Sequence, residues 1–256
     1  MEKKRTPREK ARAETEARIV EIGNRMLDAE GAEALSLRAI ARELGIVSSA
    51  VYRYVTTRDE LLTILIADAF ASIAEAVDAA LDRDRSVTAL GLAMLAWSRR
   101  FPRRWALIYG TPIAAYAAPR EVTVEPGTRV MATLVTLVAE AGVADAVGVG
   151  TAGAPGTGAA DVADVGVAEA AAADVADAGI TREQIAGSQP TPGVERVAAE
   201  LATLGIDVDA ATVLRAISTW VTIVGLISSL RFGQFGPGFD DVEDDLMISV
   251  IADLGW

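Results

Sequence analysis

The stretch that decides the fold of this chain runs from Ala34 to Leu62 and reads ALSLRAIARELGIVSSAVYRYVTTRDELL. Ser36 is a good N-cap, because its hydroxyl can accept a hydrogen bond from an unpaired N–H of a first helical turn. Gly45 suits the left-handed backbone that often follows a helix. Between these two residues an apolar stripe recurs at helical spacing and predicts a helix: Leu37, Ile40, Ala41 and Leu44.

A second, shorter helix is expected after this glycine, capped by Ser48 or Ser49 and running to about Val55. Its outward side is polar: Ser48, Ser49, Tyr52, Arg53 and Tyr54. Hydroxyl, phenol and guanidinium groups are partners for DNA phosphates and base edges. The pair of helices therefore has the layout of a helix-turn-helix DNA reader, with a helical hairpin inside a larger bundle as the alternative.

Two longer helices are expected on either side of this unit. The first runs from about Ala13 to Glu30 and ends at Gly31. The second is launched by Thr57-Arg58-Asp59-Glu60, which has the pattern of a capping box, and reaches about Leu81. Its apolar stripe predicts burial of one face: Leu61, Leu65, Ala69, Ile73 and Val77. A helix of this length can tie the reading head to the rest of the chain.

Residues 45–55 (GIVSSAVYRYV) and 58–62 (RDELL) resemble the N-terminal domain of the TetR family of bacterial transcription repressors. Members typically carry Gly-Val-Ser, a variable pair, a small-apolar-Tyr triplet and a tail like Lys-Glu-Glu-Leu-Leu. The resemblance is close over roughly residues 14–64 and looser elsewhere. Arg58 stands where lysine is usual, and Tyr54 stands where histidine is common.

This resemblance implies a set of DNA contacts. Base edges are expected to face Ser48, Ser49, Ala50 and Arg53. Phosphates are expected at Tyr52, Tyr54, Arg58 and the helix start at Ser36, and Arg38 is expected among the DNA contacts as well. It also implies an all-α fold, in which a three-helix DNA-binding domain precedes a helical ligand-binding and dimerisation bundle.

Composition argues against catalysis. The chain has 256 residues and contains no histidine and no cysteine. This removes the commonest general base, thiolate metal sites and the usual nucleophilic triads. Its three lysines, Lys3, Lys4 and Lys10, lie near the N-terminus, where they cannot serve a site in the body. We expect no enzyme, no catalytic residue, no metal and no cofactor, and we interpret the GxGxxG of residues 148–153 as a low-complexity coincidence.

Charge divides the chain into a head and a body. The net charge is −12, yet residues 1–62 hold 12 basic against 11 acidic side chains. Six basic residues lie within residues 1–12, which we expect to form a flexible basic arm that contacts DNA, with a solvated tail or a lipid contact as alternatives. The predicted domains are this arm, a helix-turn-helix domain over residues 13–60, and a ligand-binding and dimerisation domain over residues 61–256.

Further helices are expected in the body. Their predicted ranges are residues 86–101, 102–109, 127–141, 194–204, 209–232 and 241–254. Residues 142–192 are rich in Gly, Ala, Val and Asp and predict a flexible low-complexity insertion, with a possible helix near 167–178. The charge-free apolar run from Ala216 to Leu230 is shorter than the roughly 20 residues of a membrane span, so we expect a buried helix and no membrane contact.

Aromatic residues gather in two parts of the body, where packing in a core is the first interpretation. However, residues 105–112 (WALIYGTP) and 220–226 (WVTIVGL) resemble a C-terminal ligand-binding type of the TetR family that carries a Trp-His-Gly motif. Val224 stands where that histidine is usual, which favours an apolar effector. The resemblance implies an effector site near Met94, Trp97, Phe101, Trp105, Tyr109, Tyr116, Met131 and Trp220.

Two charged clusters leave alternatives open. Arg99, Arg100, Arg103 and Arg104 could attract an anionic ligand or form a solvated face. The acidic run Asp240–Asp245 could hold a metal and support a carboxylate-based enzyme, or could simply favour a helix N-terminus. The hypothesis that the sequence favours is a cytoplasmic homodimeric repressor that binds a palindromic double-stranded DNA operator and is released by a small-molecule effector. The rivals are the helical enzyme and a module that binds another protein rather than DNA.

Overall fold

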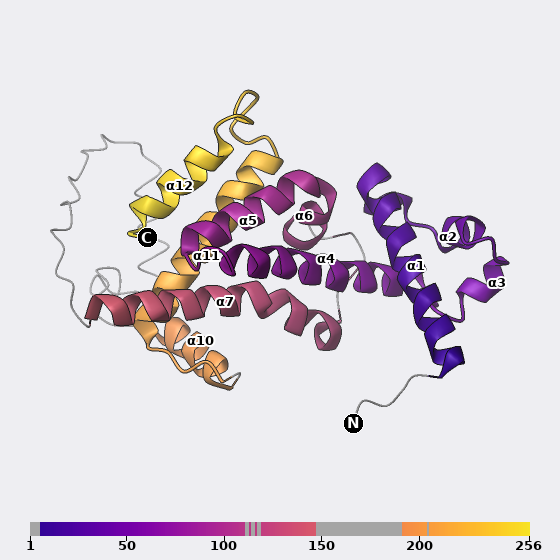
Figure 1. The fold of residues 1–256 in the computed structure, drawn as a ribbon, viewed down its shortest axis with the longest axis horizontal. Coiled ribbons are helices and arrows are strands. Elements are labelled where there is room, and N and C mark those ends of the chain that lie inside the picture. The colour runs from indigo at the N-terminus through magenta and orange to yellow at the C-terminus, as the bar shows by residue number, and fades with distance from the viewer. Residues whose placement is uncertain (1–5, 111–112, 114–115, 117–118, 147–190, 204) are drawn as a thin grey trace, which may run out of the picture. The chain divides into compact units, whose positions relative to one another are not determined.

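The computed structural model describes residues 6–110, 113, 116, 119–146, 191–203 and 205–256. Every regular element among these residues is a helix, which confirms the all-α prediction (Figure 1). The chain forms two compact units, Met1–Leu134 with Thr219–Trp256 and Val135–Ser218. Residues 147–190, which hold most of the predicted insertion, the possible helix at 167–178 and the GxGxxG at 148–153, lie outside the described residues.

The first helix, α1, spans Pro7–Glu30 and begins earlier than the expected Ala13. Its start is a complete capping box. The Thr6 hydroxyl accepts the Glu9 N–H at 3.3 Å, and the Glu9 carboxylate accepts the Thr6 N–H at 2.7 Å. These two bonds satisfy amides that a frayed helix would leave unpaired. Residues 7–12 of the predicted flexible arm are therefore helical.

The helix-turn-helix follows a short 3₁₀ turn, η1 (Ala32–Ala34), and consists of α2 (Leu37–Glu43) and α3 (Ser48–Val51). Ser36 caps α2 as predicted, accepting the Ala39 N–H at 3.4 Å. Gly45 has a φ of +69°, a conformation that costs glycine little. Val47 rather than a serine is the N-cap residue of α3, and no side chain caps this helix. It is also shorter than predicted, and turns carry the chain onward to Val55.

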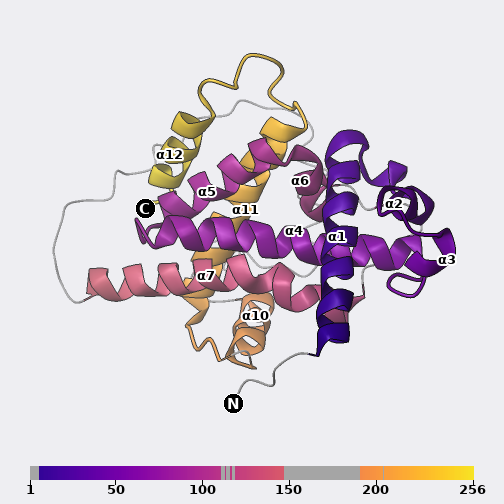
Figure 2. The ribbon, with the colours of Figure 1, turned by 45° about the vertical axis from the view of Figure 1, so that its right-hand side comes forward.

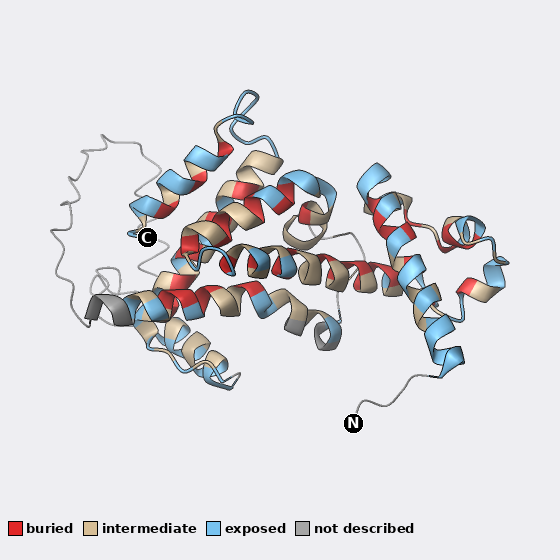
Figure 3. Cartoon of the chain, in the orientation of Figure 1, coloured by how far each residue is buried: buried red, intermediate tan, exposed pale blue. Residues whose placement is uncertain are grey.

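Helix α4 spans Arg58–Leu81 and joins the head to the body. All five residues of its predicted apolar stripe are buried, so that prediction is confirmed. The Thr57 hydroxyl caps the helix by accepting the Glu60 N–H at 3.0 Å, but the Glu60 carboxylate accepts from the N–H and hydroxyl of Thr56 instead of completing the box on Thr57. These bonds from Thr56 lower the pKa of Glu60. Figure 2 shows α4 crossing α1, and Figure 3 shows its buried face in red.

Three further helices of the first unit pack on α4, on α1 or on one another. Helix α5 spans Val87–Arg100 and contacts α4 and α12, and α6 spans Pro102–Tyr109 and contacts α1, α4 and α5. Helix α12 spans Glu243–Asp253. Ser86 caps α5 as its sequence indicates, accepting the Ala89 N–H at 3.1 Å. Proline is tolerated at the start of α6, where its missing N–H would have had no helical partner.

The remaining helices are α7 (Arg120–Ala146), α10 (Pro192–Thr203) and α11 (Ala210–Arg231). Helix α7 is longer than the predicted 127–141, because the helix continues through Pro126 despite the backbone hydrogen bond that a proline removes. Helix α11 starts where the sequence predicts, since the Asp209 carboxylate accepts the Thr212 N–H at 2.7 Å. That bond lowers the pKa of Asp209.

Among the described residues, α11 is the helix that is long and apolar enough to cross a membrane by length and composition. The charge-free run counted from the sequence, Ala216–Leu230, is shorter, because Arg215 and Arg231 bound it. The expectation of a buried helix is met only in part, because 28% of the residues in this apolar window are buried. Thr219 of this helix is buried, and its hydroxyl accepts the indole N–H of Trp256 at 3.1 Å.

The contact of α5 with α12 depends on Gly91. A Cβ at this position would lie 2.6 Å from Cδ1 of Ile251 and 3.1 Å from Sδ of Met247. We expect Gly91→Ala to lower the free energy of unfolding by about 1–3 kcal/mol through overpacking, measured by urea denaturation. The matched control is Gly142→Ala on α7, where a Cβ meets nothing within 4 Å. It should be neutral or stabilising by up to about 1 kcal/mol, and equal stability of the two variants would contradict the packing argument.

Candidate nucleic-acid interface and effector site

The outward face of α3 and the turn after it is polar and open. Ser48, Ser49 and Arg53 are exposed, and 44% of Tyr52 is accessible to solvent. On the opposite side Val51 and Val55 are buried in the core of the head, with 0% and 2% of their surface exposed. Val51 in α3 and Val55 in the turn after it thus anchor this segment to the core, while its polar side chains stay exposed to solvent. Such groups are able to bond phosphates and base edges.

Two other residues predicted to contact DNA, Ala50 and Tyr54, are less exposed than the rest of this face. Ala50 is half-buried. Tyr54 is also half-buried and packs on the head core, and the Arg12 guanidinium lies 5.7 Å from its ring centroid. At this distance the cation interacts favourably with the face of the ring. Tyr54 therefore links α1 to the turn after α3.

The remaining predicted DNA contacts lie at the ends of α2 and α4. Arg38 is exposed on α2, and the Ser36 hydroxyl is used as the cap of that helix. Arg58 is half-buried, and its Nη2 donates to the carbonyl oxygen of Ala32 at 2.8 Å. This bond joins the start of α4 to η1, so Arg58 has a structural role in the head beside the phosphate contact that its sequence implies.

The predicted effector residues do not form one cluster. Trp105, Tyr109 and Trp220 lie together: the Tyr109 ring centroid is 4.4 Å from that of Trp105 and 6.0 Å from that of Trp220. Phe70 of α4, which the sequence reasoning missed, joins them with its ring edge-on at 5.9 Å from Tyr109. Helical spacing would have placed Phe70 beside the buried stripe of α4, but nothing local marks it as a partner of α6 and α11. We call these four residues the aromatic cluster.

Trp97 and Phe101 lie instead along a groove between α4 and α5. Their ring centroids are 5.5 Å apart, and the groove has a volume of about 780 Å³. The Trp97 indole N–H donates to the Ser72 hydroxyl at 3.0 Å, which fixes this ring against α4. Three predicted residues take other places: Met94 is fully buried, Met131 is half-buried, and the Tyr116 hydroxyl is 2.9 Å from that of Thr63.

The Tyr109 hydroxyl is buried and has no hydrogen-bond partner among the residues that the structure describes. Burial raises the pKa of this phenol well above its usual value, so the group stays protonated and can donate. The Trp105 indole N–H, in contrast, donates to the Ser228 hydroxyl at 3.3 Å. An unpartnered buried hydroxyl is costly, and it is the group in this cluster that a bound molecule could satisfy.

The arginines of α5 and α6 bind within the protein. Arg104 holds the Asp28 carboxylate through two bonds of 2.9 and 2.6 Å, and Arg103 donates to the Asp28 carbonyl oxygen at 3.1 Å. Arg100 lies 5.2 Å from the Phe101 ring centroid. Arg103 and Arg104 are thus bonded within the protein, whereas Arg100 stays exposed and lines the α4–α5 groove. Arg103 and Arg104 join α6 to the end of α1.

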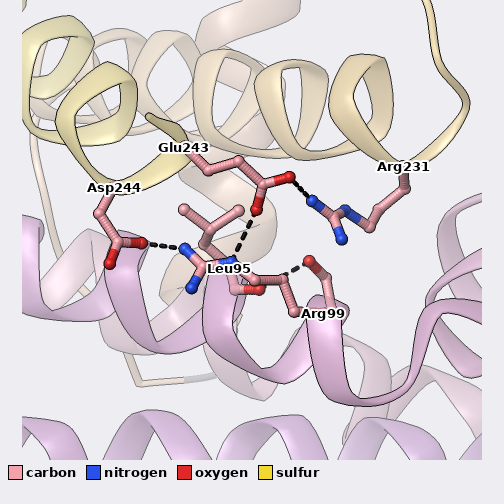
Figure 4. Close-up of polar contacts among 6 residues, drawn as sticks. Leu95, Arg99, Arg231, Glu243 and Asp244 are labelled. Carbon is pink, nitrogen blue, oxygen red and sulfur yellow. Dashed lines mark hydrogen bonds and ion pairs between the residues drawn. The ribbon is translucent and has the colours of Figure 1, made fainter. Parts of the chain in front are cut away.

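Two residues of the acidic run, Glu243 and Asp244 in the first turn of α12, belong to an ion-pair network (Figure 4). Glu243 is 2% exposed, and its carboxylate accepts from Nε of Arg99 at 2.6 Å and from Arg231. Asp244 pairs with the same Arg99 from the solvent side. Burial, and then the charge of Arg99, lower the pKa of Arg231, while Asp240 acts in the opposite direction. Over the described ranges no three acidic side chains are placed to hold a metal ion. The network joins α5, α11 and α12.

Comparisons of sequence and structure show which known proteins this chain is similar to. The pattern described as "Bacterial regulatory proteins, tetR family" matches residues 19–63, and "Tetracyclin repressor-like, C-terminal domain" matches residues 87–254. The HTH-type transcriptional regulator Rv1816 of Mycobacterium tuberculosis is 37% identical, over 96% of this chain and 96% of its own. The HTH-type transcriptional repressor DrrR1 of Streptomyces coeruleorubidus is 45% identical over 49 residues, 19% of this chain and 18% of its own. The crystal structure of SCO4313 is 30% identical with a TM-score of 0.63, covering 97% of this chain and 98% of that one.

The fold and these relatives define a DNA-binding transcriptional regulator of the helix-turn-helix class. The chain belongs to the TetR family of bacterial regulatory proteins.

The network of Figure 4 makes a direct prediction about stability. Glu243→Ala would leave Arg231, whose side chain is 13% exposed, without its carboxylate. We expect a loss of about 3–5 kcal/mol in the free energy of unfolding, because a buried charge loses its partner. Asp244→Ala is the control: this carboxylate is 60% exposed, and its removal should cost about 0–1 kcal/mol. Urea denaturation compares them, and a small loss for both variants would mean that the network does not hold α12.

Proposed function

We propose that this regulator is a repressor that binds a palindromic operator as a homodimer through α3 and is released by a small, largely apolar effector. The observation that carries the proposal is the two-sided character of α3 and the turn after it. Buried Val51 and Val55 orient the segment, and Ser48, Ser49, Tyr52 and Arg53 are left free to face DNA. The name of DrrR1, a transcriptional repressor alike over the head, supports repression rather than activation.

Dimerisation is the second part of the proposal. One α3 can read only a few base pairs, whereas two-fold symmetry presents two heads to successive major grooves. Helices α11 and α12 carry exposed apolar residues, with Val221 at 61% and Ile248 at 44%. A second copy that covers them would remove this surface from water. We therefore assign the apolar character of α11 to a protein interface in the cytoplasm rather than to a membrane.

The effector is the third part. We place its site at the aromatic cluster, and we retain Met94, Trp97, Phe101, Tyr116 and Met131 as further candidates. The rings supply apolar contact, and the Tyr109 hydroxyl supplies one polar contact. Val224 in place of the usual histidine of the Trp-His-Gly type, to which we assign this domain, fits a mainly apolar molecule.

Release would follow from a differential affinity of the effector for two conformations. Phe70 on α4 and Trp105 on α6 both belong to the aromatic cluster, so a bound molecule would press on both helices. Helix α4 begins in the head, and α6 is bonded to Asp28 at the end of α1. A shift of these helices would change the separation of the two heads on the operator.

The DNA-contact proposal is tested by removing two exposed side chains of the α3 face. We expect Tyr52→Ala with Arg53→Ala to weaken binding to the upstream region of the protein's own gene by roughly a hundredfold, because each lost contact is worth about 1–3 kcal/mol. A gel-shift titration measures it. The control, Phe235→Ala with Arg196→Ala, removes an exposed ring and an exposed guanidinium elsewhere. Unchanged binding by the first pair would refute the assignment of this face.

The dimer is tested by placing a charge on α11. We expect Val221→Glu to convert the protein to a 26.7 kDa monomer in size-exclusion chromatography with light scattering, because an unpaired carboxylate would be buried in the interface. Operator affinity should fall with it, since the two heads no longer bind together. Val122→Glu, at a 50% exposed position on α7, is the control and should leave the dimer intact. A wild-type protein that is already monomeric would exclude the homodimer.

A further inference from the structure

A small basic pocket lies between the start of α1 and the turn after α3. We call it the arginine pocket; it has a volume of about 260 Å³ and is lined by Arg8, Ala11, Arg12, Thr15, Arg53 and Tyr54. This is smaller than the roughly 300–1,000 Å³ of sites for drug-sized ligands. It suits a group of a few atoms.

The pocket exists because the capping box extends α1. Residues 8, 11, 12 and 15 are spaced three and four apart, so they share one face of a helix. Helix α1 reaches back to Pro7 since Thr6 and Glu9 cap it. Had the helix begun at about Ala13, Arg8 and Arg12 would belong to an unstructured arm. Instead a helical face presents both guanidinium groups beside Arg53.

The electrostatics of the pocket favour an anion. Three guanidinium groups line it, and no carboxylate does. Arg12 is 60% exposed; its Nε donates to Glu16 at 2.8 Å, and its guanidinium lies over the Tyr54 ring. Glu9 is not among the lining residues, and its carboxylate is bonded to Thr6, which lowers its pKa. The Thr15 hydroxyl donates to the Ala11 carbonyl oxygen at 2.9 Å. Its proton is therefore already used, and Thr15 lines the pocket without donating to a bound anion.

We propose that the arginine pocket binds one phosphate of the DNA backbone next to the groove that α3 reads. This inference rests on the proposed operator binding and replaces the expected contact of a flexible arm by a defined site on the first turns of α1. Guanidinium groups bind phosphate oxygens with a fixed fork geometry. A phosphate held between α1 and Arg53 would set the register of α3 along the duplex, because backbone contacts position a protein while base contacts specify the sequence.

The test is a salt titration of DNA binding by the full chain, followed by fluorescence anisotropy. The probes are a labelled duplex from the upstream region of the protein's own gene and an unrelated duplex of equal length. The variant is R8A/R12A. The matched control, R18A/R25A, removes two cations from exposed positions of the same helix that lie outside residues 1–12 and do not line the pocket. Circular dichroism melting checks that both variants fold as the wild type does.

For R8A/R12A we expect the slope of log K against log salt to become shallower by about 0.9 for each bound head, because one phosphate contact is lost. Binding to both duplexes should weaken by the same factor, roughly tenfold, while R18A/R25A changes little. Glu16→Gln should strengthen binding, since it frees the Arg12 guanidinium. Equal slopes for the two double variants, or weaker binding by Glu16→Gln, would overturn the inference.

The outcomes separate this inference from the proposed function. A wild-type protein that binds no upstream fragment overturns operator binding, and the pocket with it. Wild-type binding with equal slopes overturns the pocket alone. A site for free anions would appear as thermal stabilisation when inorganic phosphate replaces chloride at constant ionic strength. If that stabilisation is lost in R8A/R12A while the slopes stay equal, the backbone assignment is wrong.

Discussion

One helix contributes to two cores, and the remainder of the first unit is arranged around it. The first turns of α4 bury Leu61, Leu62 and Leu65 in the core of the head, together with Ile40 and Val51. Its later turns bury further apolar residues against the body helices: Ile73, Ala74 and Val77. Because the helix is unbroken from Arg58 to Leu81, the apolar stripe is continuous between the two cores. Burial of this apolar stripe is the main favourable contribution to the free energy that holds the core of the head and the core of the body together.

The residues that sequence alone could place are those whose role is local. Ser36 and Ser86 cap helices because a hydroxyl three residues before an amide can bond it whatever the tertiary structure is. Gly45 takes the left-handed turn for a similar reason. The buried stripe of α4 follows from helical periodicity. These features determine the helix-turn-helix, and this explains why the head was predicted more closely than the body.

The residues that the sequence could not place depend on neighbours far along the chain. Glu243 lies within an acidic run, and only the fold brings Arg99 and Arg231 to it. Phe70 looks like an ordinary core residue until α6 brings Tyr109 against it. The predicted effector residues divide between the aromatic cluster and the α4–α5 groove because Trp97 and Trp105 lie on different helices, on either side of Pro102. The basic composition of residues 1–12 is typical of a solvated tail, whereas the capping-box spacing of Thr6 and Glu9 starts α1 at Pro7.

The bonds between α6 and Asp28 have a mechanical consequence. In an ion pair made through one hydrogen bond, the two groups can rotate relative to each other about that bond. Asp28 is gripped at its carboxylate by Arg104 and at its backbone by Arg103, so rotation at this point is restrained. The Arg103 bond reaches the main chain of Asp28, so rotation of the Asp28 side chain does not weaken this second contact. A small translation of α6 would therefore be transmitted to the end of α1 through these three hydrogen bonds. Their number and geometry determine how closely the two helices move together.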